Sequence, residues 1–164
     1  MKKGFTLLET LVAIAILIAT ILGPLTLASS SIRAASTSKN QIVAFNLAQE
    51  GIEFVRNKRD TNLINGGNWL FGLEDCEELT GCYIDVTQDS SNDIRACIST
   101  CPVLKRDSIT GLFNYQNGLE TSFLRKVTVN SLSVDEAKVT VEISWNERTS
   151  SRDFTLETYL FKWR

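Results

Sequence analysis

The chain has 164 residues, a formal net charge of -2 and a hydrophobic share of 43%. This length suffices for one ordinary domain plus an accessory segment, and the charge balance shows no clustered basic surface of the kind that nucleic-acid binding requires. The sequence contains no histidine, so it lacks the commonest general base and the usual zinc ligand. We therefore expect a protein that is not an enzyme, holds no metal or cofactor and binds no nucleic acid.

A long apolar run occupies residues 5–28, and Glu9 is its only charged residue. A transmembrane helix needs ~20 such residues, so the run predicts a membrane-crossing helix. Lys2 and Lys3 precede it, and Arg33 is the next charge after it. Because short basic flanks stay in the cytoplasm, we expect the N-terminal end there and the rest of the chain outside.

Two other interpretations fit part of this segment. A secretory signal has a basic start, an apolar stretch of about 7–15 residues and a small-residue cleavage site, which LTLASSS offers, but this run is longer and carries an acid. A plain single-pass anchor accounts for the length and the orientation but leaves Glu9 unexplained. An ionised carboxylate is costly in hydrocarbon, so we expect Glu9 to have a partner.

The opening KKGFTLLETLVAIAIL resembles the class III signal of type IV pilins and of the related pseudopilins of type II secretion. A short basic leader, residues 1–4, ends at Gly4, Phe5 follows, and Glu9 lies four residues further on. The resemblance implies that a membrane-embedded aspartyl peptidase, the prepilin peptidase, cuts between Gly4 and Phe5 and usually methylates the new Phe5 amine. The span then stays with the mature protein.

Such a cut would also create a partner for Glu9. The new α-amino group at Phe5 is largely cationic at neutral pH. In a bundle of staggered helices, the Phe5 amine of one subunit can lie beside the Glu9 carboxylate of its neighbour, and each charge offsets the desolvation of the other. We expect this pairing in assembly, as in the usual account of the family. The alternative is that Glu9 is protonated or reaches the membrane surface alone.

Beyond the span, the helix is expected to continue over residues 29–58 as an amphipathic helix. Its apolar residues recur at spacings of three and four, which is typical of a helix with one face against a core; they are Ala44, Ala48, Ile52 and Val55, flanked by Leu47 and Phe54. Pro24, directly after Gly23, is expected to kink the helix within the span. The stretch AFNLAQEGIEFVRNKRD is similar to the corresponding part of minor pilins of the V type and pseudopilins of the I type.

The rest of the chain, residues 59–164, has the pattern of a β-rich head. KVTVEISW alternates apolar and polar residues, and TSFLRKVTV before it and RDFTLETYLFKW after it alternate as well, with Arg125 as an exception on the apolar face. Short polar connections predict an antiparallel meander of these three runs, packed by one face on the amphipathic helix. The expected fold class is α+β, a long N-terminal helix packed on a small antiparallel sheet. The aromatic residues are expected in the core or covering the sheet, with a ligand platform as the alternative; they are Trp145, Tyr159, Phe161 and Trp163.

Four cysteines mark a hairpin region over residues 76–101; they are Cys76, Cys82, Cys97 and Cys101. Their spacing lacks the C-x2-C pairs usual in zinc sites, and thiols outside the cytoplasm meet an oxidising compartment, so we expect disulfides rather than zinc. CYIDV and IRACI flank the turn-like TQDSSND, and such a hairpin would place Cys82 opposite Cys97 and leave Cys76 near Cys101. We predict these nested pairs. Sequential pairs, Cys76 with Cys82 and Cys97 with Cys101, are the alternative, because sequence alone does not fix connectivity.

Oxygen-rich stretches are a weaker candidate for chemistry. GLEDCEEL and DVTQDSSND carry many carboxylates and hydroxyls, which are calcium ligands. They match no complete EF-hand pattern, so we expect solvated loops.

These features predict a minor pilin or pseudopilin, a structural subunit that enters a type IV pilus-like filament through its N-terminal helix. The expected partners are other pilin subunits, the prepilin peptidase, the inner-membrane assembly platform and, before assembly, membrane lipid. The expected location is the cytoplasmic (inner) membrane with the head outside the cytoplasm, and then a pilus or pseudopilus. Cysteines in mid-domain differ from the C-terminal pair of many major pilins, which favours a minor subunit. The alternative is a membrane-anchored extracytoplasmic binding module that does not polymerise.

Overall fold

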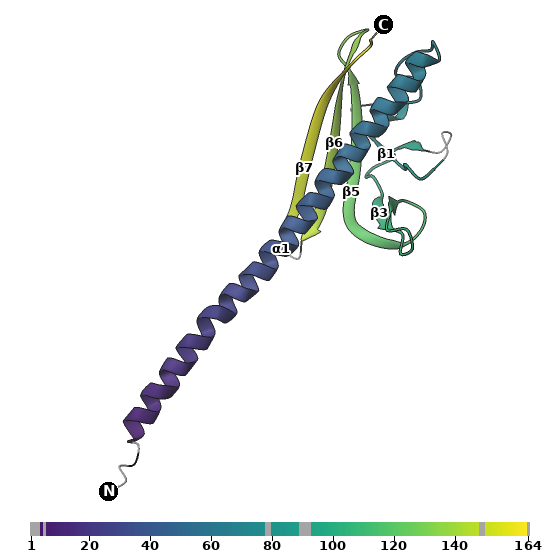
Figure 1. The fold of residues 1–164 in the computed structure, drawn as a ribbon. Coiled ribbons are helices and arrows are strands. Elements are labelled where there is room, and N and C mark those ends of the chain that lie inside the picture. The colour runs from purple at the N-terminus through teal and green to yellow at the C-terminus, as the bar shows by residue number, and fades with distance from the viewer. Residues whose placement is uncertain (1–3, 5, 78–79, 89–92, 148–149, 164) are drawn as a thin grey trace. The chain divides into compact units, whose positions relative to one another are not determined.

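The computed structural model of the chain describes residues 4, 6–77, 80–88, 93–147 and 150–163. Its first element is the helix α1 (Leu7–Ile64), which is followed by antiparallel strands (Figure 1). This order confirms the α+β fold class that the sequence predicts. The described elements after α1 are η1 (Glu74–Cys76), β1 (Cys82–Ile84), β2 (Ile94–Ala96), β3 (Val103–Arg106), β4 (Phe113–Asn114), β5 (Leu119–Ser131), β6 (Glu136–Glu147) and β7 (Ser150–Phe161).

The chain divides into two compact units, Met1–Asn40 and Gln41–Arg164. The first unit contains the apolar half of α1, and the second, the head, contains the remainder of α1 and every strand that the structure describes. This division lies within the segment 29–58 that the sequence predicts as one amphipathic helix.

The apolar half of α1 has no buried side. Within the described residues, α1 is the helix that is long and apolar enough to cross a membrane, with an 18-residue window of mean hydropathy 2.5 that is entirely exposed. Its large side chains, such as Leu17 and Ile21, are more than half exposed. Side chains of this kind need lipid or other apolar helices around them, which indicates that this helix anchors the protein in a membrane.

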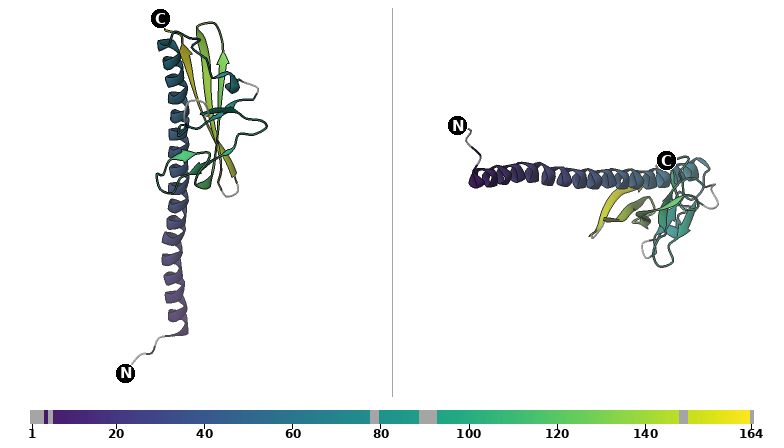
Figure 2. Two further views of the ribbon diagram at one scale, coloured as in Figure 1. Left: turned by 90° about the vertical axis from the view of Figure 1, so that its right-hand side faces the viewer. Right: turned by 90° about the horizontal axis from the view of Figure 1, so that it is seen from below.

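The three longest strands of the head form a meander. β5 pairs with β6 in antiparallel register from Phe123 opposite Trp145 to Ser131 opposite Ala137. β6 pairs with β7 over the whole of β7, so β7 is an edge strand of the sheet (Figure 2). This meander confirms the prediction from the alternating sequence.

Four short strands complete the sheet on the other side of β5. β1 pairs with β5 at Cys82 opposite Val127, and β2 pairs with β1. β3 pairs with β5 from Val103 opposite Leu124, and β4 pairs with β3. The two small hairpins β1–β2 and β3–β4 therefore share one edge of a single long strand.

The core of the head lies between the second half of α1 and the sheet. Small residues on α1 let the helix approach closely: a Cβ atom at Gly51 would lie 3.2 Å from Val141 Cγ1. The predicted apolar stripe is confirmed, since all four of its residues are buried. The chief contributors to this core are Ala44, Leu47, Ala48, Ile52 and Val55 from α1, and Val127, Val139, Val141 and Ile143 from the sheet.

α1 ends later than the predicted boundary at residue 58, because its last turn is held by contacts with the loop that follows. Asn62 Nδ2 donates hydrogen bonds to the carbonyl oxygens of Trp69 and Phe71. The helix ends at Ile64, and Gly66 reverses the chain with a φ of 71° that glycine adopts without strain. The predicted end of the helix within NKRDTNLINGG therefore lies just before the two glycines of this stretch.

Of the four aromatic residues expected in the core or covering the sheet, Trp145 is the one that lies in the core. Trp145 is 3% exposed, whereas Tyr159, Phe161 and Trp163 are 50–56% exposed. Tyr159 and Phe161 alternate with the buried Leu160, so they face away from the core on the edge strand β7. The sequence pattern predicts the alternation of β7. It does not show that the face of β7 opposite Leu160 is exposed.

Candidate functional site

The N-terminal motif is divided between described and undescribed residues. Gly4 is exposed and precedes α1, whereas Phe5 lies outside the described residues. The Thr6 hydroxyl accepts a 3.3 Å hydrogen bond from the backbone N–H of Glu9. With Leu7 as the first helical residue, Thr6 and Glu9 occupy the two positions of a capping box, Ser or Thr at the N-cap and Glu three residues later.

Glu9 therefore has a local role as well as a proposed intermolecular one. An acid in the first turn of a helix interacts favourably with the unpaired N–H groups there. The Glu9 side chain is exposed, and among the described residues no lysine or arginine pairs with its carboxylate. Its predicted pairing with the Phe5 amine falls on a residue outside the described part and stays a prediction.

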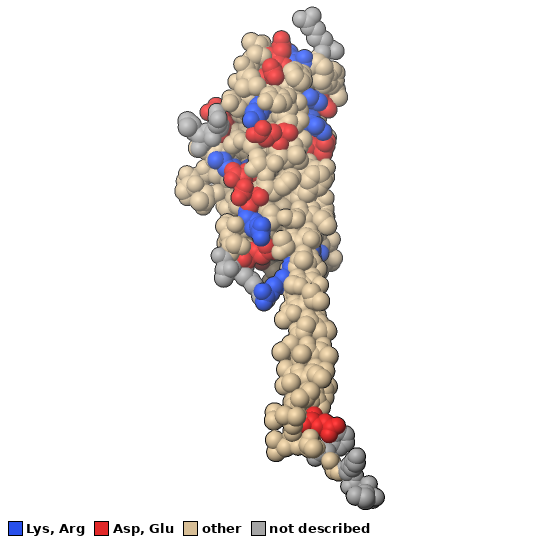
Figure 3. Space-filling view, turned by 90° about the vertical axis from the view of Figure 1, so that its left-hand side faces the viewer, with Lys and Arg blue, Asp and Glu red and all other residues tan. Residues whose placement is uncertain are grey.

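The threonine hydroxyl groups within residues 7–28 of α1 are satisfied within the helix. Thr20 and Thr26 donate 2.8 Å hydrogen bonds to the carbonyl oxygens of Leu17 and Gly23. Polar groups in hydrocarbon need such internal partners. Residues 7–32 of α1 carry no charge apart from Glu9, and the face of α1 seen in Figure 3 shows only this acid near its start.

Pro24 lies inside α1, and the helix continues on both sides of it. A proline lacks the N–H that would bond the carbonyl four residues earlier, so the helix has one hydrogen bond fewer at this turn. The proline does not end the helix, and the kink at Pro24 stays a prediction.

A buried arginine joins three parts of the head. Arg125 of β5 is fully buried, and its Nη1 donates to Glu50 Oε2 at 2.6 Å and to the Leu47 carbonyl oxygen at 3.1 Å. Its Nη2 donates to the carbonyl oxygen of Ile84 in β1 at 2.6 Å. Arg125 thus connects the helix, the long strand and the β1–β2 hairpin. The sequence shows it only as a charge at an inward position of an alternating strand, and no sequence signal identifies Glu50 as its partner.

Two further polar residues lie near this arginine. Burial raises the pKa of the Tyr115 phenol, although the positive charge of Arg125 opposes this effect. Asp85, which is 3% exposed, accepts hydrogen bonds from the Tyr115 backbone N–H and from the hydroxyl and N–H of Thr87. These bonds hold the β1–β2 and β3–β4 hairpins together.

The disulfides of the head are Cys76–Cys82 and Cys97–Cys101, so the predicted nested pairing is wrong and the sequential alternative is correct. The hairpin itself forms as predicted, but Cys82 lies opposite Ala96 rather than Cys97. A shift of one residue turns a side chain to the other face of a strand, so Cys97 does not face Cys82. The 3-10 turn η1 instead brings the Cα atom of Cys76 to 4.5 Å from that of Cys82.

Metal ligation has little support in the described residues. Both disulfides together use all four sulfur atoms, so no thiolate remains for zinc. Within the described part of the chain, no group of three or more acidic, cysteine or histidine side chains is arranged to hold a metal ion. In DVTQDSSND, Asp85 is engaged in a turn, and residues 89–92 lie outside the described part.

A family model described as the prokaryotic N-terminal methylation motif matches residues 1–23. No curated protein matches the chain, and neither does any solved structure. The matched segment contains the basic leader, the junction of Gly4 with Phe5, and Glu9. Together with a long apolar helix followed by an antiparallel sheet, the motif supports a precursor of the type IV pilin or pseudopilin type.

Proposed function

We propose that this protein is a minor pilin or pseudopilin, a structural and non-enzymatic subunit of a type IV pilus-like or type II secretion-like filament. The observation that carries the proposal is the motif at the start of α1, in which Gly4, Phe5 and Glu9 stand at the spacing of a processing and methylation signal. The prepilin peptidase removes residues 1–4, and the apolar half of α1 stays with the mature chain.

Assembly then proceeds through α1. The Phe5 amine of one subunit neutralises the Glu9 carboxylate of its neighbour, which allows both charges to leave water. The fully exposed apolar side of α1 supports this arrangement, because it supplies the surface on which neighbouring helices pack. The partners are other pilin or pseudopilin subunits, the inner-membrane assembly platform and, before assembly, lipid.

The head lies outside the cytoplasm in this proposal. Lys2 and Lys3 before the span favour a cytoplasmic N-terminus. The two disulfides of the head fit an oxidising compartment. The competing function is a membrane-anchored extracytoplasmic binding module that keeps its leader and does not polymerise.

Mass spectrometry of protein recovered from native membranes and sheared filaments tests the proposal. The expected chain begins at Phe5, is heavier by one methyl group and is lighter by two hydrogens for each disulfide. A chain that begins at Met1 would favour the anchored module. A chain that begins near Ser29 would mean that the opening segment is only an export signal.

Replacement of Glu9 separates processing from assembly. In Glu9→Gln, cleavage after Gly4 should persist while incorporation into filaments falls, because the substitution removes the charge that pairs between subunits and leaves Gly4 and Phe5 unchanged. Thr10→Val is the matched control, since Thr10 is an exposed neighbour without charge. Normal incorporation of Glu9→Gln would contradict the proposed pairing.

A further inference from the structure

We propose that a pocket beside η1 binds the cationic segment of α1, residues 33–39, from a second copy of this chain. The proposal rests on the proposed function, because it names a contact between the heads and the helices of neighbouring subunits. It concerns residues that the N-terminal motif does not include.

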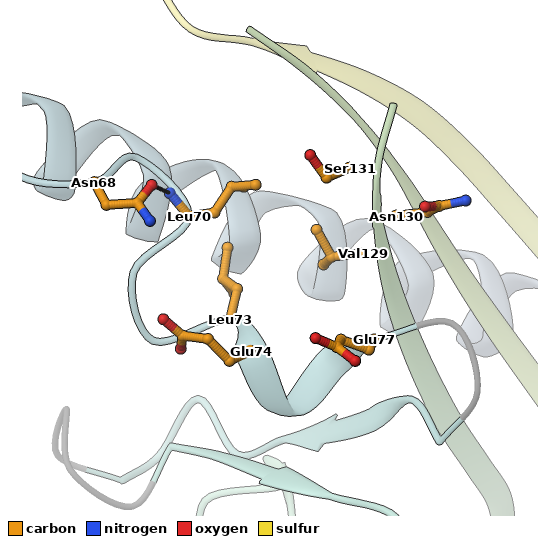
Figure 4. A pocket seen from close by; sticks show the side chains of 8 residues that line it. All are labelled: Asn68, Leu70, Leu73, Glu74, Glu77, Val129, Asn130 and Ser131. Atoms are coloured by element: carbon orange, nitrogen blue, oxygen red, sulfur yellow. Dashed lines mark hydrogen bonds between the residues drawn. The ribbon is translucent and has the colours of Figure 1, made fainter. Parts of the chain in front are cut away.

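The pocket has an apolar floor and two carboxylates at its rim, and its volume is about 410 Å³. Leu70, Leu73 and Val129 form the floor, and Glu74 and Glu77 flank it (Figure 4). The complete lining consists of Asn68, Leu70, Leu73, Glu74, Glu77, Val129, Asn130 and Ser131.

This combination suits the side chain of a lysine or an arginine. Such a side chain has an apolar stem, which can lie on the leucines, and a charged end, which can reach the carboxylates. Glu74 and Glu77 are exposed, and neither forms an ion pair with any residue that the structure describes. The pocket therefore presents two acids that no described lysine or arginine neutralises in an ion pair.

The cations that could occupy this pocket lie in the first unit of the chain, Met1–Asn40. Arg33 and Lys39 are exposed, they have no ion-pair partner among the described residues, and no acid lies between Glu9 and Glu50. Four of the 17 basic residues and one of the 19 acidic residues lie in residues 1–40, so the first unit has a net charge of +3 and the head of -5. After removal of Lys2 and Lys3 with the leader, the positive charge of the first unit's side chains is concentrated in residues 33–39.

The geometry of such a contact favours a second copy as the occupant. A pocket and a complementary segment at different places on one chain make a heterologous contact, which extends into a filament when it does not close into a ring. The same two surfaces are then used once by every subunit. This is the kind of contact that a polymer of identical chains requires.

Zero-length crosslinking with a carbodiimide tests the contact directly. Filaments are assembled from a mixture of ¹⁴N- and ¹⁵N-labelled full-length chains, treated with the reagent and digested for mass spectrometry. We expect an amide between Lys39 and Glu74 or Glu77 that joins differently labelled chains. The Lys138–Glu157 pair, with Nζ and Oε1 2.8 Å apart, is the internal control for the reagent.

Charge exchange provides the second test. The double variants Glu74→Lys with Glu77→Lys, and Arg33→Glu with Lys39→Glu, should each lower incorporation by about tenfold, which corresponds to ~1.4 kcal/mol. Combining all four substitutions should restore incorporation. Asp153→Lys, which reverses an exposed acid on β7, is the matched control and should incorporate normally.

The possible failures are distinguishable. Filaments that give the Lys138–Glu157 crosslink but none from Lys39 to the pocket would overturn this inference and leave the proposed function intact. Reduced incorporation of Arg33→Glu with Lys39→Glu that the pocket variants do not restore would overturn this inference and leave the proposed function intact. A wild-type chain that is processed but never enters filaments would overturn both proposals.

Discussion

Arg125 of β5 donates a 2.6 Å hydrogen bond from Nη1 to the carboxylate of Glu50 on α1, and the two partners differ sharply in exposure. The Arg125 side chain is 1% exposed, whereas that of Glu50 is 35% exposed. The same guanidinium also donates to two backbone carbonyl oxygens, on α1 and on β1. The Arg125 side chain therefore links α1, β5 and the β1–β2 hairpin, which carries Cys82.

Because Arg125 is buried and Glu50 is partly exposed, replacing one or the other should lower the free energy of unfolding by different amounts. Glu50→Ala leaves a buried cation without its counter-charge, and the free energy of unfolding should fall by up to ~3–5 kcal/mol. Arg125→Met should cost less, because methionine fills apolar space and Glu50 can turn to water. Thermal unfolding of the full chain in detergent, followed by tryptophan fluorescence, measures both. Glu157→Ala, at the exposed pair with Lys138, is the control and should cost ~0–1 kcal/mol. Equal losses for Glu50→Ala and Glu157→Ala would contradict this view of Arg125.

Gly51 permits the close approach of α1 to the sheet. A Cβ atom there would lie 3.2 and 3.3 Å from the two methyl carbons of Val141, a fully buried residue in the middle strand of the meander. Gly51→Ala should therefore destabilise the head, even though alanine stabilises a helix interior by ~1 kcal/mol relative to glycine. Gly51→Leu should be far worse.

A double-mutant cycle checks this packing argument. Val141→Ala makes room, so Gly51→Ala should cost less free energy of unfolding in that background than in the wild type. Gly67→Ala is the control, since the nearest atom to its Cβ would be the Asn62 carbonyl oxygen at 3.8 Å. If Gly51→Ala stabilises the wild type instead, β6 must be able to shift away from α1 at Val141.

The disulfide pairing predicts a distinctive tryptic digest. Cleavage after Arg59, Arg95 and Lys105 gives one peptide, 60–95, that contains both Cys76 and Cys82, and another, 96–105, that contains both Cys97 and Cys101. With the observed pairs, each peptide should appear separately and lighter by two hydrogens under non-reducing conditions. The two peptides linked together would instead show that the cysteines pair between the two segments, in the nested or the crossed arrangement.

The turn after β3 should respond to acid. The Asp107 carboxylate accepts hydrogen bonds from the N–H groups of Thr110 at 2.7 Å and Ile109 at 2.8 Å, and these bonds lower its pKa, with that from Thr110 having the larger effect. Because the folded pKa lies below the unfolded value of ~3.9, the ionised form stabilises the turn above that pH. This stabilisation is lost as the pH falls through the folded pKa.

Nuclear magnetic resonance of the full chain in detergent can follow the amide protons of Ile109 and Thr110 through this range. Both should shift together as Asp107 is protonated. Asp107→Asn should abolish the shared transition while the amides of β5 and β6 stay unchanged. A transition that persists in Asp107→Asn would assign it to another group.

Several parts of this protein can be predicted from local sequence pattern alone. The processing motif, the apolar span, the helix stripe from Ala44 to Val55 and the meander of the last three strands all follow from residue spacing, because helices and strands repeat at fixed periods. The hairpin around TQDSSND follows from the same rule. The function proposed here depends chiefly on this local information.

Contacts between groups that lie far apart in the sequence depend on the tertiary structure instead. The one-residue register of β1 and β2, which separates Cys82 from Cys97, depends on how both strands pair with their neighbours. Arg125 finds Glu50 across 75 residues of sequence, and no local pattern contains that distance. The pocket formed by η1 and the end of β5 likewise exists only after the loop has folded onto the strand. Local periodicity fixes which face of an element is apolar, but packing against other elements decides which polar groups are left to pair and which surfaces stay open.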